Sequence, residues 1–460
     1  MNYPLLYLET LGCPKNQADS RQICAMFYQR GYPLSPDPQE AEVILLNTCG
    51  FIDEAKEESI DTILQLSGWK EKGRCRVLIV FGCMVQKYRD EMEKSLPEAD
   101  AYFGVNEEPA LFAYIDRYMA QAGPLPAARA PAPDFLQAGH FADSYYRAWP
   151  AYYEEEPAGY IKIAEGCSHH CTFCVIPQIK GSYRSRTPAS IIEEAAGRAA
   201  KGLKEIILVA QDTGAYGRDL SPASSLAELV TMLTAIDAIE RIRILYCYPE
   251  GIDEALIQAM RHPKVCPYLD MPIQHIDDGV LRRMGRPMDS RQIKRVIDRL
   301  REEVPDIAIR TTCLLGFPGE SAEAFQSLMD FLEEYRLERV GFFAFSPQPD
   351  TIAAQMPNQV PDDEKERRLA IAQEKRDLLL RGRLDELVGR ILCVLIDEKS
   401  AEDDKLYYYE GRSAWDAPEI DATVSFSSRR RLSPGQIVSV RITHSMDYIL
   451  SGEIADESCQ

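Results

Sequence analysis

Short apolar runs alternate with polar segments of helical period along the first quarter of the chain. The apolar runs are LLYLETLGC, AEVILLNTCGF and RVLIVFGC, and the segments of helical period that follow them cover 17–30, 53–70 and 86–95. Strand followed by helix, repeated, is typical of a parallel α/β sheet. We therefore predict a flavodoxin-like parallel-sheet domain over residues 1–122.

A second alternation of the same kind begins near Gly159. It has six apolar runs, GYIKIAEGC, EIILVAQD, RIRILYCYP, YLDMPIQ, AIRTTCLLGFPGE and ERVGFFAFSP, with helical stretches between them. A full TIM barrel of eight βα units typically needs about 250 residues, so six units in about 190 residues predict a partial TIM-type (βα)6 barrel. A helix over about 362–388 closes this segment, because its leucines follow one stripe. We assign the barrel domain to 159–388.

The pattern changes on both sides of this barrel. GPLPAARAPAP, which begins at Gly123, is rich in Ala and Pro, and we assign 123–158 as a linker. After 388 the chain reads as short strands separated by turn residues: ILCVLIDEK, KLYYYEGRS, ATVSFSS and QIVSVRITHS. This predicts a small β-barrel over 389–460. A length of 460 residues is consistent with about three such domains.

Charge and hydropathy narrow the possible partners and the compartment. The chain carries 52 Lys and Arg against 72 Asp and Glu, a formal net charge of −20. Nucleic-acid binders usually show a basic footprint, so we do not expect nucleic acid as the primary partner, and an acidic surface suits a basic protein. The longest apolar run, VLIVFGCMV, is too short to span a bilayer, and the N-terminus does not resemble a signal peptide. We expect a cytoplasmic protein with no membrane association.

Thirteen cysteines in a reducing compartment favour metal binding or catalysis over disulfides. Three of them, Cys167, Cys171 and Cys174, form a C-x-x-x-C-x-x-C run directly after the first barrel strand. Three thiolates within eight residues can hold one face of an iron–sulfur cluster and leave one iron open. Zinc is the alternative, but it would need a fourth ligand, such as His169 or His170. Position at a barrel-strand end favours a catalytic role.

A second set of cysteines lies at equivalent points of the N-terminal domain. Cys13, Cys49 and Cys83 each end a predicted strand. Parallel strands end at a common edge, where open α/β sheets bind their ligands, so the three thiols can converge in space. Glycines beside them would let the backbone approach a bulky ligand. Each could also be an ordinary packed thiol, but three at equivalent strand ends favour a second metal site.

The C-x-x-x-C-x-x-C run at the end of a first barrel strand resembles the radical S-adenosylmethionine enzymes. The resemblance implies that Cys167, Cys171 and Cys174 are catalytic and hold a 4Fe-4S cluster whose open iron binds S-adenosylmethionine. One-electron reduction would then yield methionine and a 5′-deoxyadenosyl radical, with the protein positioning and shielding the cofactor.

The strings LGCPKN, ILLNTCGFID followed by AKEESIDTI, and FGCMVQKY resemble the N-terminal domain of the methylthiotransferases within that superfamily. The C-terminal β segment resembles the TRAM module of the same family. The resemblance implies that Cys13, Cys49 and Cys83 hold a second 4Fe-4S cluster, which delivers a methylated sulfur. It also implies an electron donor and a sulfur source as partners. Lys180 stands where this family pattern leads us to expect an arginine.

The methylthiotransferases divide into enzymes that modify transfer RNA and an enzyme that modifies small-subunit ribosomal protein S twelve. LGCPKN, QDTGAYG and DAPEID resemble the protein-modifying branch, and the net charge of −5 over 388–460 suits a basic ribosomal protein. The implied reaction inserts a methylthio group at the β-carbon of an aspartate. A transfer RNA methylthiotransferase and a non-catalytic iron–sulfur electron-transfer protein remain the alternatives.

Residues beyond the cysteines are candidates on position alone. Later strand ends of the barrel predict Gln211, Asp212, Gln274, Gly316 and Glu320 as ligands of S-adenosylmethionine, although each could instead be a cap or turn residue. The guanidinium of Arg186 could bind a carboxylate, with a surface salt bridge as the alternative. Within the terminal module, Asp416, Glu419 and Asp421 are the candidates for contacting the basic substrate.

Overall fold

The computed structural model describes residues 3–50, 52–121, 156–403 and 405–455 of the 460-residue chain. The chain forms two compact units, and each is described by itself. The first comprises Met1–Tyr153, Ala164–His169 and Cys174–Glu194, and the second comprises Glu154–Ile163, His170–Phe173 and Ala195–Gln460. Within the described ranges, no helix combines the length and the apolar character needed to cross a membrane.

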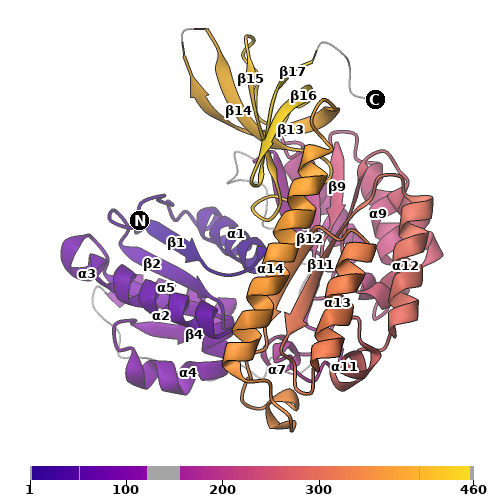
Figure 1. Cartoon of the computed structure of the whole chain (residues 1–460). Helices are drawn as coiled ribbons and strands as arrows, with labels where there is room; N and C mark the ends of the chain where they lie inside the picture. The colour runs from indigo at the N-terminus through magenta and orange to yellow at the C-terminus, as the bar shows by residue number, and fades with distance from the viewer. Residues whose placement is uncertain (1–2, 51, 122–155, 404, 456–460) are drawn as a thin grey trace. The chain divides into compact units, whose positions relative to one another are not determined.

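A four-stranded parallel sheet forms the centre of the first unit (Figure 1). Residues of β2 and β3 are buried on both faces, which is why their sequences read as continuous apolar runs. The strands are β1 Leu6–Thr10, β2 Val43–Thr48, β3 Val77–Gly82 and β4 Ala101–Phe103. The predicted parallel sheet is therefore confirmed.

The strand order of this sheet agrees with the flavodoxin-like prediction. The named strands follow the order β1-β2-β3-β4, and a parallel bridge between Leu6 and Leu34 adds an edge segment on the other side of β1. With that segment counted as the second strand of the chain, the order is 2-1-3-4-5, which is the order of a flavodoxin-like sheet. Helices cover both faces: α1 Pro14–Gln29 and α5 Glu108–Gln121 on one, and α2 Asp53–Ser67 and α4 Cys83–Ser95 on the other.

The second unit contains a sheet of six parallel strands, in the order β12-β11-β10-β9-β8-β5. It confirms the six predicted βα units. The strands are β5 Ala158–Lys162, β8 Glu205–Val209, β9 Arg241–Ile244, β10 Val265–Asp270, β11 Ala308–Leu315 and β12 Arg339–Ala344. The helices between and after them are α8 Pro188–Ala199, α9 Leu226–Thr234, α10 Glu254–Met260, α11 Asp278–Arg283, α12 Ser290–Glu303, α13 Ala322–Glu334 and α14 Asp362–Asp385. In Figure 1, α14 runs beside β12 and α13, which it contacts.

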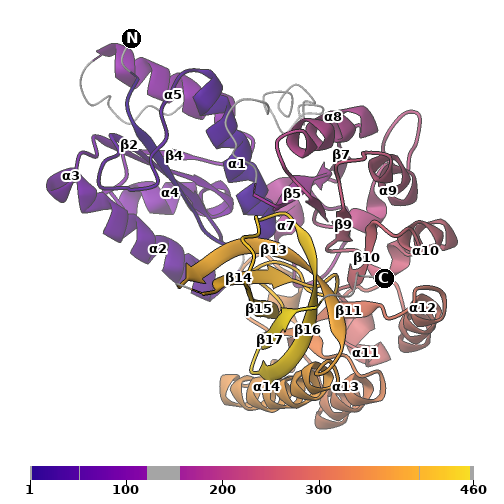
Figure 2. The ribbon, with the colours of Figure 1, turned by 90° about the horizontal axis from the view of Figure 1, so that it is seen from above.

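A closed five-stranded barrel ends the chain, with the order β13-β14-β15-β17-β16 (Figure 2). Four of its strands are those that the sequence predicts: β13 Ile391–Glu402, β14 Tyr407–Arg412, β15 Thr423–Ser428 and β16 Ile437–Met446. The fifth, β17 Ile449–Ile454, was not predicted, because Ser451 and Gly452 interrupt its apolar alternation. The predicted linker lies almost entirely in 122–155, outside the described residues, and the predicted domain limits stay predictions.

Candidate functional site

The first cysteine set lies at the carboxyl ends of three neighbouring strands. Cys13 is the N-cap of α1, Cys49 directly follows β2, and Cys83 is the first residue of α4. Gly12 has a φ of +94°, and a Cβ added there would lie 2.7 Å from the Cβ and 3.1 Å from the Sγ of Cys49. Only a glycine therefore allows the chain before Cys13 to approach Cys49 so closely.

Two buried asparagines connect these strand ends. Asn16 donates from Nδ2 to the carbonyl oxygens of Leu11, at 2.9 Å, and Thr48, at 3.3 Å. Asn47 donates from Nδ2 to Asn16 O, at 3.2 Å, and to Ser20 Oγ, at 2.9 Å. The segments that carry Cys13 and Cys49 are thus joined by side-chain hydrogen bonds. Sequence reasoning missed both residues, although a polar residue inside a buried strand run, as at Asn47, is the signal that could have identified them.

Helix N-termini and a lysine favour negative charge on these thiols, whereas burial and the neighbouring acidic groups oppose it. Cys13 and Cys83 lie at helix N-termini, where the helix dipole stabilises an anion. Burial nevertheless raises the pKa of the free Cys83 thiol to about 12, although Lys180 acts in the opposite direction. Lys180 is buried, and its Nζ lies 3.4 Å from an oxygen of Asp19 and 3.6 Å from an oxygen of Glu165.

Helix α7, Ile176–Lys180, follows the second cysteine set directly and belongs to the first unit. Its Ile179 and the preceding Val175 pack against Cys83 in one small apolar cluster. Lys180, at the end of the same helix, therefore lies near Cys83 because the helix is held there by apolar contacts. This explains how an ammonium group is maintained beside a buried thiol.

The thiols of the second cysteine set have different surroundings. Cys167 is buried, and its N–H donates to Gly181 O at 3.1 Å, while Cys174 Sγ accepts a hydrogen bond from the N–H of Ile176 at 3.4 Å. Cys171 is half-buried, and Arg286 Nη1 lies 3.7 Å from its Sγ. Among the described residues, no three His, Cys, Asp or Glu side chains surround a common point closely enough to ligate a single metal ion.

The segment 283–286 holds the part of the cysteine loop that belongs to the second unit. Thr172 donates from its N–H to Met284 O, at 2.9 Å, and from Oγ1 to Arg283 O, at 2.8 Å. Gly285 has a φ of +75°, and a Cβ there would lie 2.7 Å from His170 O. Backbone contacts therefore determine the course of the loop on either side of Cys171.

The predicted ligands of S-adenosylmethionine fall into two groups. Asp212 is buried and caps a short helix, because its Oδ1 accepts from Gly214 N at 3.0 Å and from Tyr248 N at 3.3 Å. Glu320 Oε2 accepts from Gly316 N at 2.7 Å, and its Oε1 accepts from Arg368 Nη1 at 2.7 Å. These two carboxylates stabilise the strand-end loops themselves, and Gly316 supplies the left-handed turn at a φ of +70°.

Gln211 and Gln274 are half-buried after the ends of β8 and β10. Gln274 has a φ of +70°, an uncommon conformation for a residue with a side chain. Its backbone pairs with Thr312 and Leu314 in a bridge to β11. Backbone strain of this kind is often found at functional sites, so Gln274 stays a candidate.

The chain is similar along nearly its whole length to proteins of known family. The chain matches the family model described as Uncharacterized protein family UPF0004 over residues 5–104, the Radical SAM superfamily over 161–332 and the TRAM domain over 388–455. It is 42% identical over 448 residues to the ribosomal protein uS12 methylthiotransferase RimO of Geobacter sulfurreducens, covering 97% of each chain. The protein of that name from Heliobacterium modesticaldum is 40% identical over 453 residues, covering 98% of this chain and 95% of the other.

The chain belongs to the ribosomal protein uS12 methylthiotransferase family. The resemblance stated from its motifs, including the protein-modifying branch and the TRAM module, is thereby confirmed. A solved structure of the radical S-adenosylmethionine methyltransferase TsrM from Kitasatospora setae has a TM-score of 0.55 at 16% identity, covering 76% of this chain and 77% of that one. That likeness shows a shared fold.

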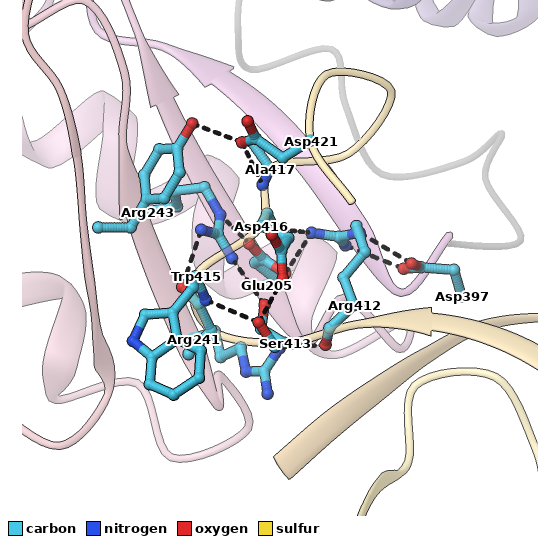
Figure 3. A network of polar contacts seen from close by, with 12 residues as sticks. Glu205, Arg241, Arg243, Asp397, Arg412, Ser413, Trp415, Asp416, Ala417 and Asp421 are labelled. Atoms are coloured by element: carbon cyan, nitrogen blue, oxygen red, sulfur yellow. Dashed lines mark hydrogen bonds and ion pairs between the residues drawn. The ribbon is translucent and has the colours of Figure 1, made fainter. Parts of the chain in front are cut away.

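The predicted substrate contacts in this uS12 methylthiotransferase family member have partners within the chain. Arg186 is buried and donates from Nη1 to Glu194 Oε2 at 2.7 Å, so the alternative of a salt bridge within the chain is present, although it is buried and not at the surface. Asp416 accepts from Arg339 at 3.1 Å, and Asp421 accepts from Tyr268 at 2.7 Å and from Arg310 at 3.1 Å. Figure 3 shows both aspartates in the polar network between the six-stranded sheet and the terminal barrel. Glu419 is exposed, with a φ of +65°.

Proposed function

We propose that this chain methylthiolates the β-carbon of an aspartate in ribosomal protein uS12, using S-adenosylmethionine, a sulfur source and an electron donor. Family membership supports the reaction class. The single observation that carries the proposal is the presence of two separate three-cysteine sets, one at a sheet edge and one after a barrel strand. A ribosomal protein as the substrate, free or on the ribosome, implies action in the cytoplasm.

Cys167, Cys171 and Cys174 would hold one 4Fe-4S cluster, and Cys13, Cys49 and Cys83 would hold a second. The donor chemistry fits, because each set supplies three soft thiolates and so leaves one iron open. When bound, the cluster at Cys167, Cys171 and Cys174 would supply the electron that cleaves S-adenosylmethionine. The cluster at Cys13, Cys49 and Cys83 would carry the sulfur to be transferred.

The chain's own residues support these two roles. Gly12 leaves room beside Cys49 that a side chain would fill, and the helix N-termini at Cys13 and Cys83 offset negative charge. On the barrel side, Gly285 leaves room for the cysteine loop. Gln211 and Gln274 are the proposed contacts to S-adenosylmethionine, and Asp212, Gly316 and Glu320 shape the loops around them.

The acidic charge of the chain supports a basic protein as the substrate. The terminal module carries net charge −5 over 388–460, with 8 Lys and Arg against 13 Asp and Glu. Glu419 is a candidate for contact with the substrate because it is exposed, whereas Asp416 and Asp421 are largely buried and position the module. An electron donor and a sulfur source complete the proposed partners.

The test measures iron and sulfide after anaerobic reconstitution, for wild type beside the triple variants C13A/C49A/C83A and C167A/C171A/C174A. We expect about eight irons in wild type and about four in each variant. Each preparation is then incubated with dithionite, S-adenosylmethionine, sulfide and purified uS12, and mass spectrometry detects replacement of one hydrogen by a methylthio group. Only wild type should modify uS12, while C13A/C49A/C83A should still cleave S-adenosylmethionine. Modification of transfer RNA instead of uS12, or four irons in wild type, would contradict the proposal.

A further inference from the structure

Arg286 places a cation against Cys171, one of the three cysteines that follow the first barrel strand (Cys167, Cys171 and Cys174, the barrel-side set). Its side chain is 3% exposed, and its Nη1 lies 3.7 Å from the Sγ of Cys171, within hydrogen-bonding distance for a sulfur acceptor. The two residues are 115 positions apart, so the contact depends on the fold of the second unit. No local sequence pattern predicts the approach of Arg286 to Cys171, because the two residues are far apart in the chain.

Three further contacts hold the guanidinium in this position. Nη2 donates to Pro272 O at 3.1 Å, and the guanidinium carbon lies 4.3 Å from the centre of the Tyr248 ring. Glu250 Oε2 lies 3.8 Å from Nη2. A carbonyl, an aromatic face and a carboxylate therefore fix the orientation in which Nη1 points at the sulfur.

The course of the cysteine loop does not require this guanidinium. Thr172 is bound by backbone carbonyls of Arg283 and Met284, and Ala353 N donates to Thr172 O at 2.9 Å. Gly285 allows the close approach to His170. Since these contacts already hold the loop, a buried arginine directed at a thiol adds charge next to the sulfur and little additional fixation of the backbone.

We propose that Arg286 is a positioning residue that raises the reduction potential of the cluster held by Cys167, Cys171 and Cys174. The inference rests on the proposed function, because it assumes a cluster at these thiols. Hydrogen bonds to ligand sulfurs and nearby charge are among the determinants of iron–sulfur potentials. Reduction adds one electron from an external low-potential donor and makes the cluster more negative by one charge. A fixed guanidinium stabilises that reduced state more than the oxidised state.

Glu250 should act in the opposite sense. Its carboxylate lies 3.8 Å from Nη2 of Arg286 and partly compensates the charge of the guanidinium. Removing that carboxylate charge leaves the guanidinium field at the sulfur less compensated. Arg286 and Glu250 therefore predict potential shifts of opposite sign, which a purely structural role for Arg286 would not produce.

The experiment uses the full chain in the C13A/C49A/C83A background, so that a single cluster is titrated. Midpoint potentials are measured by redox titration followed by electron paramagnetic resonance, with iron content measured in parallel. Arg286→Met should make one-electron reduction at least tenfold less favourable, a fall of about 59 mV for a one-electron couple. Arg286→Lys keeps the charge and loses the planar fork, so its midpoint potential should fall by less than that of Arg286→Met. Glu250→Gln should raise the potential.

Arg283→Met is the matched control, because Arg283 donates to the carbonyls of Pro318 and Gly319 instead of to a sulfur. Its potential should change by much less than that of Arg286→Met. An unchanged potential in iron-loaded Arg286→Met overturns the inference and leaves the proposed function intact. If Arg286→Met takes up no iron, Arg286→Lys and Glu250→Gln decide, and shifts of the same sign in both would overturn it. Failure of the background variant itself to hold iron would remove the proposed function as well.

Discussion

Arg243 donates from Nε to Oε1 of Glu205 across 2.6 Å, and both side chains are fully buried. The other oxygen of Glu205 lies 3.1 Å from Arg412 Nη1 of the terminal barrel. Burial alone would raise the pKa of Glu205, but Arg243, Arg412 and Arg241 lower it to about 2. One carboxylate thus links β8, β9 and β14, as Figure 3 shows.

Glu205→Gln should destabilise the protein strongly, because it leaves buried guanidinium groups without their shared counter-charge. Breaking a buried ion pair by removing one partner costs about 3–5 kcal/mol. Urea denaturation at pH 7 would measure the free energy of unfolding. The control is Glu303→Gln, which removes a surface partner of Arg261 at 3.4 Å and should cost under about 1 kcal/mol. An equal loss of unfolding free energy in the two variants would show that the buried ion pairs of Glu205 stabilise the fold no more than a surface ion pair does.

His275 should make stability fall on acidification. Burial lowers its pKa from 6.5 to about 4, so the folded chain stays neutral there while the unfolded chain takes up a proton below pH 6.5. The stabilisation is complete above pH 6.5 and is lost as the pH falls toward 4, to a total of about 3 kcal/mol. Unfolding free energies at pH 7 and pH 5 for wild type and His275→Gln would isolate this residue from Glu320, which lies 3.9 Å away. A variant with the same pH dependence as wild type contradicts this prediction.

Gly285→Ala should disturb the barrel-side cysteine loop. The new methyl group would meet His170 O, and a φ of +75° is itself strained for alanine, at about 1–3 kcal/mol. We expect reconstituted protein to lose iron from this set, measured in the C13A/C49A/C83A background. Gly197→Ala is the control, because Gly197 lies within α8 with no atom within 4 Å of the added Cβ. That control should keep its iron, and its free energy of unfolding should rise by up to about 1 kcal/mol.

Asn47→Ala should reduce the iron bound by Cys13, Cys49 and Cys83, the N-terminal set. It leaves the oxygens of Asn16 and Ser20 without the Asn47 amide in a buried site, at a cost of about 1–3 kcal/mol. Iron content in the C167A/C171A/C174A background should fall, while cleavage of S-adenosylmethionine by the otherwise wild-type enzyme should persist. A full complement of iron at the N-terminal set would show that the asparagine contacts do not position Cys13 and Cys49.

Asp421→Asn should lower the stability of the fold, and Glu419→Gln should lower the affinity for uS12, because Asp421 holds the terminal module and Glu419 is the proposed substrate contact. Asp421 accepts from Tyr268 and Arg310, and charged hydrogen bonds of this kind contribute about 1.5–3 kcal/mol. Asp421→Asn should therefore lower stability, whereas Glu419→Gln should change it by less than about 0.5 kcal/mol. Affinity for uS12, measured by titration calorimetry, should fall in Glu419→Gln. Weaker binding in Asp421→Asn at unchanged stability would restore Asp421 as a substrate contact.

Much of the fold follows from local pattern. Continuous apolar runs become the buried strands β2 and β3, alternation with helical segments becomes the six-stranded sheet, and the positions of Cys13, Cys49 and Cys83 after strands place them at one edge. These features depend on neighbouring residues and on the common direction of parallel strands. The spacing of Cys167, Cys171 and Cys174 is local in the same sense.

Contacts between distant residues needed the tertiary structure. The bridge of Leu34 to β1, the asparagine link between Asn16 and Asn47, and the approach of Arg286 to Cys171 all depend on which segments pack together. Asp416 and Asp421 read as surface acids in the sequence, yet arginines of the sheet bury them. Hydrophobic periodicity records which face of an element is buried. It does not record the partner, because pairing is selected by complementarity over the whole fold.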